Sequence, residues 1–113
     1  MKTDRELLIL AAKAAGLHFH GHRIGLDYQN CYVSETGSTD GWFVWSPLTD
    51  DGDALRLAAK LGIGIDHASR RSWAWRSWGN PTVLAHEERH DGDPYVATRR
   101  AIVRAAAALG DQL

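Results

Sequence analysis

The sequence predicts an α+β fold, with helices packed on an antiparallel sheet in the order α-β-β-β-α-β-β-α. Two observations carry this prediction. Residues 4–15, 50–61 and 94–109 have apolar side chains at helical spacing, beginning at a capping residue and ending near a glycine. Residues 17–47 are instead rich in aromatic and β-branched side chains. A chain of 113 residues is long enough for one hydrophobic core, so we expect a single domain over residues 1–113.

The first helix begins at a capping box, in which Thr3 and Glu6 are three residues apart, and Gly16 ends it. Three further segments follow, with the sequences LHFHGHRIGL, DYQNCYVSE and GWFVWSP. Their alternating, aromatic and β-branched side chains favour strands. The stretch at residues 37–41 favours a turn before the third of them. We therefore expect a three-stranded antiparallel meander.

The second helix follows Pro47, which ends the third strand, and either Thr49 or Asp50 caps it. Gly62 ends this helix. Helical spacing directs four of its apolar residues toward the core: Leu55, Ala58, Ala59 and Leu61.

The segment between the second and last helices, residues 63–92, has the least regular pattern. Residues 65–69 favour a strand, and Trp73 and Trp75 alternate as they would on another. Residues 82–87 fit a strand or a helix, because the preceding Asn-Pro suits a helix start whereas the Thr-Val pair is β-branched. We expect strands throughout.

The last helix gives the strongest structural signal in the sequence. Asp93 is a capping residue, Pro94 suits the first helical position, and Gly110 follows the last turn as a C′ glycine. Arg100 and Arg104 lie four residues apart on one face. The apolar face comprises Tyr95, Val96, Ile102, Ala105, Ala106 and Leu109.

Composition excludes several classes of partner and location. The net charge of −1 gives no bulk attraction to DNA or to an anionic membrane. A single cysteine, Cys31, makes no intramolecular disulfide, which fits a reducing cytosol. The N-terminus lacks the pattern of a signal peptide, and no apolar run has the length of a membrane span. We therefore expect a soluble, intracellular protein.

Two stretches resemble a known family. Trp45–Ile63, WSPLTDDGDALRLAAKLGI, has an aromatic-Pro-Leu entry to a helix, and Asp93–Gly110, DPYVATRRAIVRAAAALG, has a closing Arg-Arg-Ala-Ile-Val-Arg helix. In this order they are similar to the bacteriophage ABA-sandwich domain, a family of small tailed-phage proteins. The resemblance implies antiparallel strands layered between helices, which makes residues 1–113 a single α/β/α sandwich domain with an antiparallel sheet layered between helices. It also implies a phage or prophage gene. It implies no catalytic residue and no cofactor, because the family has no assigned activity.

The stretch His86-Glu87-Glu88-Arg89-His90 satisfies the zinc-protease pattern H-E-x-x-H. In that pattern, two histidines one helical turn apart bind the metal and the glutamate activates a bound water. A metal-dependent hydrolase at His86, Glu87 and His90 would also need a third ligand and a cleft. Glu88 and Arg89 suit a solvated segment, and an Asp-Gly pair breaks the chain next. We interpret the stretch as a polar approach to the last helix and expect no enzyme.

A second histidine cluster lies near the N-terminus. His18, His20 and His22 alternate, so one face of a strand would carry three imidazoles, which are ligands for zinc, nickel or copper. Phe19 between them favours the opposite arrangement, with the aromatic ring inward and the histidines in water. We expect no metal here or at His86 and His90, and no other cofactor.

One segment interleaves arginines with large aromatic residues: Arg70, Arg71, Trp73, Trp75, Arg76 and Trp78. Arginine neutralises phosphates and tryptophan stacks on bases, which suits single-stranded nucleic acid. The same residue types are enriched at protein–protein hot spots. A structural alternative is that the tryptophans cover the sheet while the arginines are solvated. The missing positive charge counts against nucleic acid, and we predict a protein-binding surface.

These observations lead to one function hypothesis and two alternatives. The hypothesis is a phage- or prophage-encoded accessory protein that binds a host protein in the host cytoplasm. Host takeover or counter-defence, for example as an anti-CRISPR-like inhibitor, is its expected role. The first alternative is a small nucleic-acid-binding protein that uses Arg70–Trp78, and the second is the metal-dependent hydrolase. A membrane is not an expected partner.

Overall fold

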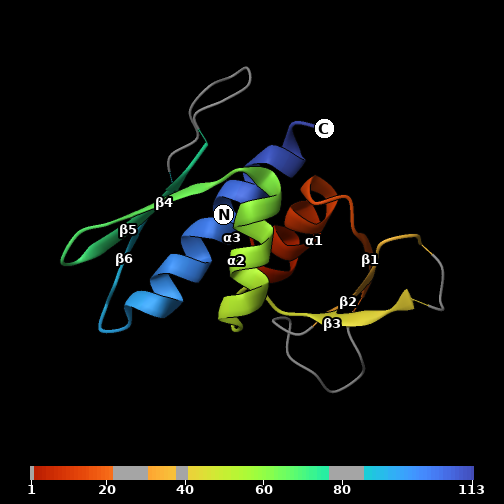
Figure 1. The fold of residues 1–113 in the computed structure, drawn as a ribbon, viewed down its shortest axis with the longest axis horizontal. Coiled ribbons are helices and arrows are strands. Elements are labelled where there is room, and N and C mark those ends of the chain that lie inside the picture. Colours follow the sequence, from red (N-terminus) through yellow and green to blue (C-terminus); the bar gives the residue numbers. More distant parts are fainter. Residues whose placement is uncertain (1, 22–30, 38–40, 77–85) are drawn as a thin grey trace.

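Three helices form the centre of the molecule, and a small antiparallel sheet lies on each side of them (Figure 1). The computed structural model describes residues 2–21, 31–37, 41–76 and 86–113. Their elements are, in order, α1 (Asp4–Ala14), β1 (His18–Gly21), β2 (Cys31–Ser34), β3 (Phe43–Trp45), α2 (Asp51–Leu61), β4 (Gly64–His67), β5 (Arg71–Trp75), β6 (His86–Arg89) and α3 (Pro94–Asp111). The α+β class and the order of elements are those predicted, and the segment between α2 and α3 forms three strands where the predicted order counted two. Residues 82–85 of the predicted strand 82–87 lie outside the described residues.

The strands form two sheets, where a single sheet was expected. Strands β1, β2 and β3 make one antiparallel meander, and β4, β5 and β6 make another. The helices therefore form the middle layer (Figure 1). The reason lies in α3, whose buried residues surround most of its circumference: Ala97, Ala101, Ile102, Val103, Ala105, Ala106, Ala107 and Gly110. A helix that is apolar on several sides is covered on several sides, here by α1, α2 and the second sheet.

All three helices begin at the predicted capping residues. The Thr3 hydroxyl accepts a hydrogen bond from the Glu6 backbone N–H at 3.2 Å, and the Asp50 carboxylate accepts one from Asp53 at 2.8 Å. The Asp93 carboxylate accepts from the first backbone N–H groups of α3. Gly62, with a φ of 68°, ends α2 as predicted, because the left-handed conformation suits a residue without a Cβ.

A tight turn joins β6 to α3 and folds the helix back over the second sheet. The N–H of Asp93 donates to the carbonyl of His90, and the two central residues, Asp91 and Gly92, have φ values of 47° and 95°. Two positive φ angles between such partners define a type I′ turn, for which Asp-Gly is a favoured pair. The Asp-Gly break expected after His90 is this turn.

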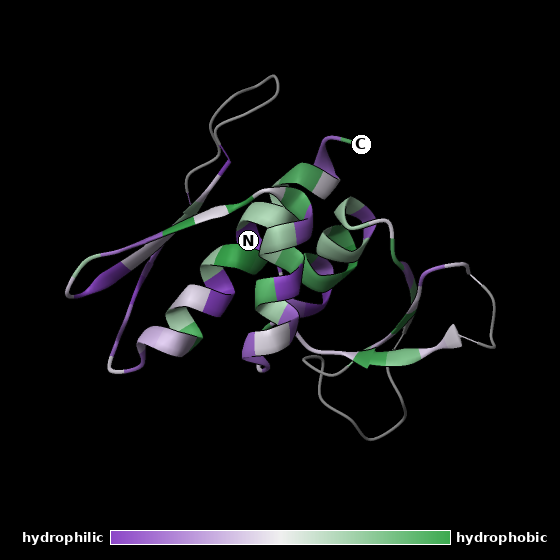
Figure 2. Cartoon of the chain, in the orientation of Figure 1, coloured by the Kyte–Doolittle hydropathy of each residue, from purple (hydrophilic) through white to green (hydrophobic). Residues whose placement is uncertain are grey.

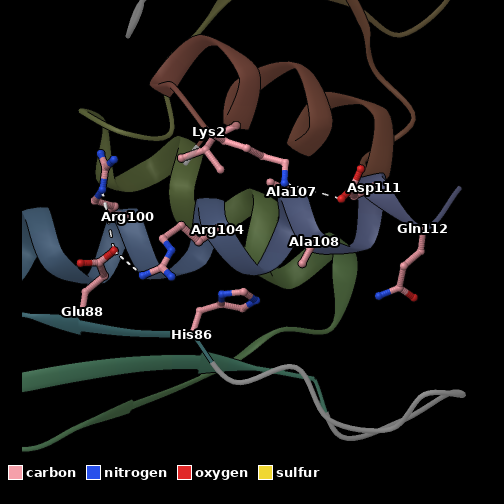
Figure 3. Close-up of a pocket in the computed structure, with 10 residues that line it drawn as sticks. Lys2, His86, Glu88, Arg100, Arg104, Ala107, Ala108, Asp111 and Gln112 are labelled. Carbon is pink, nitrogen blue, oxygen red and sulfur yellow. Dashed lines mark hydrogen bonds and ion pairs between the residues drawn. The ribbon is translucent and has the colours of Figure 1, made fainter.

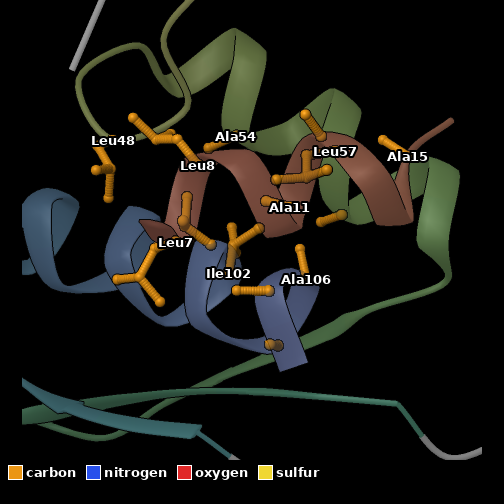
Figure 4. Packing of buried hydrophobic residues seen from close by; sticks show 14 of the residues in the cluster. Leu7, Leu8, Ala11, Ala15, Leu48, Ala54, Leu57, Ile102 and Ala106 are labelled. Carbon is orange, nitrogen blue, oxygen red and sulfur yellow. The ribbon is translucent and has the colours of Figure 1, made fainter. Parts of the chain in front are cut away.

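The core is built where the three helices meet (Figure 4). Leu8 of α1, Leu57 of α2 and Ile102 of α3 are each at most 3% exposed. The first sheet adds Val33 and Trp45 to the same cluster. Figure 2 shows hydrophobic residues concentrated on the helices and on β3, whereas β6 is hydrophilic. Among the described residues, none of the helices is long and apolar enough to cross a lipid bilayer.

Gly110 has a different role from the predicted one. The helix α3 continues to Asp111, so Gly110 does not end it. A Cβ at Gly110 would lie 1.9 Å from the backbone oxygen of Leu10, so α1 and α3 approach to backbone contact at this point. The glycine is present because the neighbouring helix leaves no room for a side chain.

Four apolar residues predicted to face the core are exposed instead: Leu55, Ala59, Tyr95 and Val96. Tyr95 is 67% exposed, Val96 is 46% exposed and Leu55 is 63% exposed. On α3 the buried positions begin only at Ala97, beyond the first turn. On α2 the buried stripe is Ala54, Leu57 and Ala58. Alanine-rich helices have little contrast between their faces, so apolar spacing alone did not fix which face turns inward.

Candidate functional site

The candidate site is the face of the sheet β4–β5–β6 that points away from α3. Ser72 and Ala74 of β5 have no exposed surface, and the Ser72 hydroxyl lies 3.0 Å from the Thr98 hydroxyl of α3. Because side chains alternate along a strand, Arg71, Trp73 and Trp75 project from the opposite face. Antiparallel pairing places residues of β4 and β6 beside them. We call this set the outer face: Asp66, Arg71, Trp73, Trp75, Glu87 and Arg89.

The two tryptophans of the outer face are partly exposed. Trp73 stands opposite Asp66 on β4 and Glu87 on β6. Trp75 stands opposite Gly64, where a Cβ would come within 2.7 Å of the indole ring, so the ring covers the bare backbone. The indole N–H of Trp75 donates to the Asp66 carboxylate at 2.8 Å. The ring of Trp75 is therefore held by both packing and a hydrogen bond.

The charges of the outer face compensate one another. The guanidinium of Arg71 pairs with the Glu87 carboxylate at 2.6 Å, and both side chains are almost half exposed. With Arg89 and Asp66 added to this pair, the outer face carries two positive and two negative side chains. A surface of this kind combines aromatic area with directional polar groups, which is the composition of protein–protein hot spots.

Half of the predicted Arg/Trp segment comes together on this face. Arg71, Trp73 and Trp75 share it, as their alternation predicted. Arg70 is exposed beside β5, and Arg76 directly follows the strand and is partly buried. Trp78 lies outside the described residues.

Sequence reasoning missed the charged members of the outer face. Asp66, Glu87 and Arg89 come from the two neighbouring strands and reach Trp73 only through the pairing register. The sequence held no signal for this face in His86–Arg89, because all four residues are polar and their alternation between partly buried and exposed positions appears only in the structure.

The H-E-x-x-H residues form a strand, so they lack the helical geometry of a zinc protease. His86 and Glu88 face α3, with His90 following in phase, and Glu87 projects from the outer face. Four residues of strand separate the two histidine Cα atoms by about 13 Å, whereas one helical turn separates them by about 6 Å. Among the described residues, no group of three or more His, Cys, Asp or Glu side chains is arranged to hold a metal ion.

The N-terminal histidines are only partly described. His18 lies on β1 and is exposed, as predicted for the solvated face. The pairing of β1 with β2 shifts register between Phe19 and Gly21, so strict alternation does not continue along the strand. The side chain of His20, and all of His22, lie outside the described residues.

A charged hollow of about 730 Å³ lies between β6 and α3 (Figure 3). Glu88 accepts a hydrogen bond from Arg104 at 2.7 Å and lies 3.7 Å from Arg100, which also pairs with Asp4 at 2.9 Å. His86 lies beside them. Its pKa is lowered, chiefly by burial and then by the positive charge of Arg104, so the neutral imidazole is favoured. The contacts of Glu88 with Arg100 and Arg104 join β6 to α3, and both carboxylates that line the hollow, Glu88 and Asp111, are in ion pairs.

We expect Glu88→Gln to destabilise the fold more than the neighbouring change Glu87→Gln. Glu88 is about one-fifth exposed and contacts two arginines of α3, whereas Glu87 pairs with one exposed arginine. Urea unfolding should show a loss of about 1 kcal/mol for Glu88→Gln and less than about 0.5 kcal/mol for Glu87→Gln. Equal losses would show that Glu88 does not hold β6 to α3.

Cys31 is buried in β2, and its thiol donates to the Trp45 carbonyl at 3.1 Å. Burial, and then the negative charge of Asp53, raise the pKa of this thiol to about 12. We expect a disulfide reagent at pH 8 to label Cys31 in the native protein at least about 100-fold more slowly than in the protein unfolded in guanidinium, because the thiolate is the nucleophile. Rapid labelling of the native protein would place Cys31 at the surface.

The free energy of unfolding should also fall as the pH rises from 9 toward 12, because in this range the Cys31 thiol ionises only in the unfolded protein.

A scan against protein-family models found no match to this chain, and searches of the curated proteins and of the solved structures found none either.

Proposed function

We propose that this protein acts by binding another protein through the outer face of the sheet β4–β5–β6. The observation that carries the proposal is the pair of partly exposed rings, Trp73 and Trp75, beside charges that already compensate one another. Tryptophan covers a large contact area with two rotatable bonds, so burying it against a partner costs little conformational entropy. The paired charges around it provide orientation and specificity.

The partner that fits the proposal best is a host protein. Its support is the resemblance to a phage family, which implies a phage or prophage gene and the host cytoplasm as the place of action. The proposed role is host takeover or counter-defence by an inhibitor of the anti-CRISPR type that acts through protein binding alone. The H-E-x-x-H strand supports no hydrolase at His86, Glu87 and His90, because the strand separates the histidines.

A nucleic-acid partner is the second candidate, and one observation favours it. Arg70, Arg71 and Arg89 line one hollow beside the turn that precedes α3. Three guanidinium groups in one place suit phosphate oxygens. Against this, Arg71 is paired with Glu87, Asp91 lines the same hollow, and the net charge of the chain is −1. Protein binding is the better supported function.

Affinity capture from a bacterial host lysate tests the proposal. The bait is the wild-type protein, with Arg71→Ala as the test variant and Arg56→Ala as a matched control. Arg56 is likewise an exposed arginine in an ion pair, at 2.7 Å from Asp53, but lies on α2. We expect one host protein to be captured by wild type and Arg56→Ala and to be reduced with Arg71→Ala. A partner captured equally by all three baits would exclude this use of Arg71.

Salt dependence separates the two candidate partners. The affinity of a protein partner should fall only slightly between 50 and 200 mM salt. A nucleic-acid partner that contacts several phosphates loses affinity by about tenfold or more over such a range, because binding releases counterions. A steep salt dependence, together with loss of binding in Arg70→Ala and Arg89→Ala, would replace the protein-binding proposal with the second candidate.

A further inference from the structure

A second hollow, of about 520 Å³, lies on the opposite face of the same sheet, between β4, α2 and α3. Its walls are largely apolar and include Leu55, Ile65, Tyr95 and Ile102. Leu55 and Tyr95 are more than 60% exposed, so the apolar wall continues to the molecular surface. Cavities of this size and character are typical of small-molecule sites when a few polar groups converge in them.

The polar groups of this hollow converge on one buried hydroxyl. Ser72 has no exposed surface, and three groups surround its Oγ: Nδ1 of His67 at 3.0 Å, Nε2 of His90 at 2.8 Å and Oγ1 of Thr98 at 3.0 Å. His67, His90 and Thr98 all line the hollow. They come from β4, from the end of β6 and from α3, so the network forms only in the folded protein.

The positions of the protons follow from counting donors. The Thr98 hydroxyl has one hydrogen, which it donates to the Pro94 carbonyl at 2.7 Å, since a carbonyl only accepts. Thr98 must therefore accept the hydrogen of Ser72. With its only hydrogen used, the Ser72 oxygen accepts from both imidazoles. This assigns the N–H of His67 to Nδ1 and the N–H of His90 to Nε2.

In a neutral imidazole whose proton is on one nitrogen, the other nitrogen is an acceptor. Within the described residues, neither Nε2 of His67 nor Nδ1 of His90 makes a hydrogen bond. The charged residues that line the hollow are already engaged, because Arg99 pairs with Asp51 at 2.5 Å and donates to the Leu48 carbonyl at 2.9 Å. The hollow therefore offers an apolar wall and hydrogen-bond acceptors without an unpaired ionic group.

The geometry points to a binding site for a small, uncharged molecule with an apolar body and a hydrogen-bond donor. The donor would contact His67 or His90, and the apolar body would lie against Ile65 and Ile102. This site is separate from the outer face, which is formed by the alternate residues of the same strands. It does not rest on the proposed protein-binding function, so either can fail without the other.

Phenol and toluene are probes that test this assignment, because they share an apolar ring and differ in the donor. Binding is followed at pH 8, where histidine is ordinarily neutral, by backbone-amide NMR of the full chain. We expect phenol to shift the amides of residues 65–67 and 98–102 with a Kd of roughly millimolar size, as befits so small a ligand. Toluene should bind about fivefold more weakly, because it lacks the hydroxyl group that donates one hydrogen bond. Equal affinities, or no shifts at these residues, would overturn the proposal.

Three variants show whether the acceptors act as inferred. The double variant His67→Phe/His90→Phe should bind phenol no more tightly than toluene, whereas His86→Phe, on the same face of β6, should keep the preference. Leu55→Asp changes an exposed wall residue, so it should remain folded and weaken both probes. Long-range ¹H–¹⁵N spectra of the wild type should show hydrogen on Nδ1 of His67 and on Nε2 of His90. A phenol preference that survives in the double variant, or the opposite tautomers, would refute the assignment.

Discussion

Replacing Ile102 by aspartate is expected to abolish the cooperative folding of this protein. Ile102 is 2% exposed and lies where α3 meets the other two helices (Figure 4). A carboxylate there has no partner, and burying an unpaired charge costs more than about 4 kcal/mol, close to the whole stability of a small domain. Thermal denaturation followed by circular dichroism should show no sigmoidal transition.

A matched substitution shows whether the effect depends on position. Leu55 is a large apolar residue on α2 that is 63% exposed. Leu55→Asp introduces the same charge at a solvent-exposed position, so the melting temperature of this variant should stay within a few degrees of that of the wild type. A wild-type melting temperature for Ile102→Asp, or collapse of Leu55→Asp, would mean that the assignment of the buried faces is wrong.

Gly110→Ala is expected to destabilise the fold nearly as much as Ile102→Asp, although it adds only one methyl group. The new Cβ would lie 1.9 Å from the Leu10 backbone oxygen, and a backbone cannot move aside as a flexible side chain can. The helices α1 and α3 must then separate along their shared alanine-rich faces. We expect a loss of about 3 kcal/mol or more in the free energy of unfolding, measured with urea.

Gly41→Ala is the control for Gly110→Ala. A Cβ at Gly41 would have no neighbour within 4 Å. We expect its effect on the free energy of unfolding to stay within about 0.5 kcal/mol. If Gly110→Ala were equally mild, the close approach of α1 and α3 would not be a feature of the fold.

The helices and strands of this fold could be predicted from the sequence because residues at their own ends determine where they begin and end. The caps at Thr3, Asp50 and Asp93, and the glycine after α2, act within a few residues. The layering of the two sheets and the helices depends instead on contacts between residues far apart in the sequence. Whether two meanders join into one sheet depends on what covers α3, and an alanine-rich helix with buried residues around most of its circumference shows no preferred side in its apolar spacing. The same lack of contrast explains why Leu55 and Tyr95 were expected in the core.

The candidate site was predictable only as far as it depends on neighbours within one strand. Alternation within one strand identified Arg71, Trp73 and Trp75 as neighbours, because period two requires only that the segment be extended. Asp66 and Glu87 join them through strand register, which the sequence did not reveal. The Ser72 network combines β4, β5, β6 and α3, so no sequence pattern could have assembled it.

The most direct test of the proposed working surface is the Kd of the captured partner for Trp73→Ala, measured by calorimetry beside Trp42→Ala. Trp42 is also a surface tryptophan, 47% exposed, but it lies next to β3 of the other sheet. Both variants should keep the wild-type melting temperature within a few degrees. We predict at least about a tenfold loss of affinity for Trp73→Ala, as for a hot-spot residue, and none for Trp42→Ala. Wild-type affinity in Trp73→Ala, or a loss confined to Trp42→Ala, would contradict the assignment of binding to the outer face.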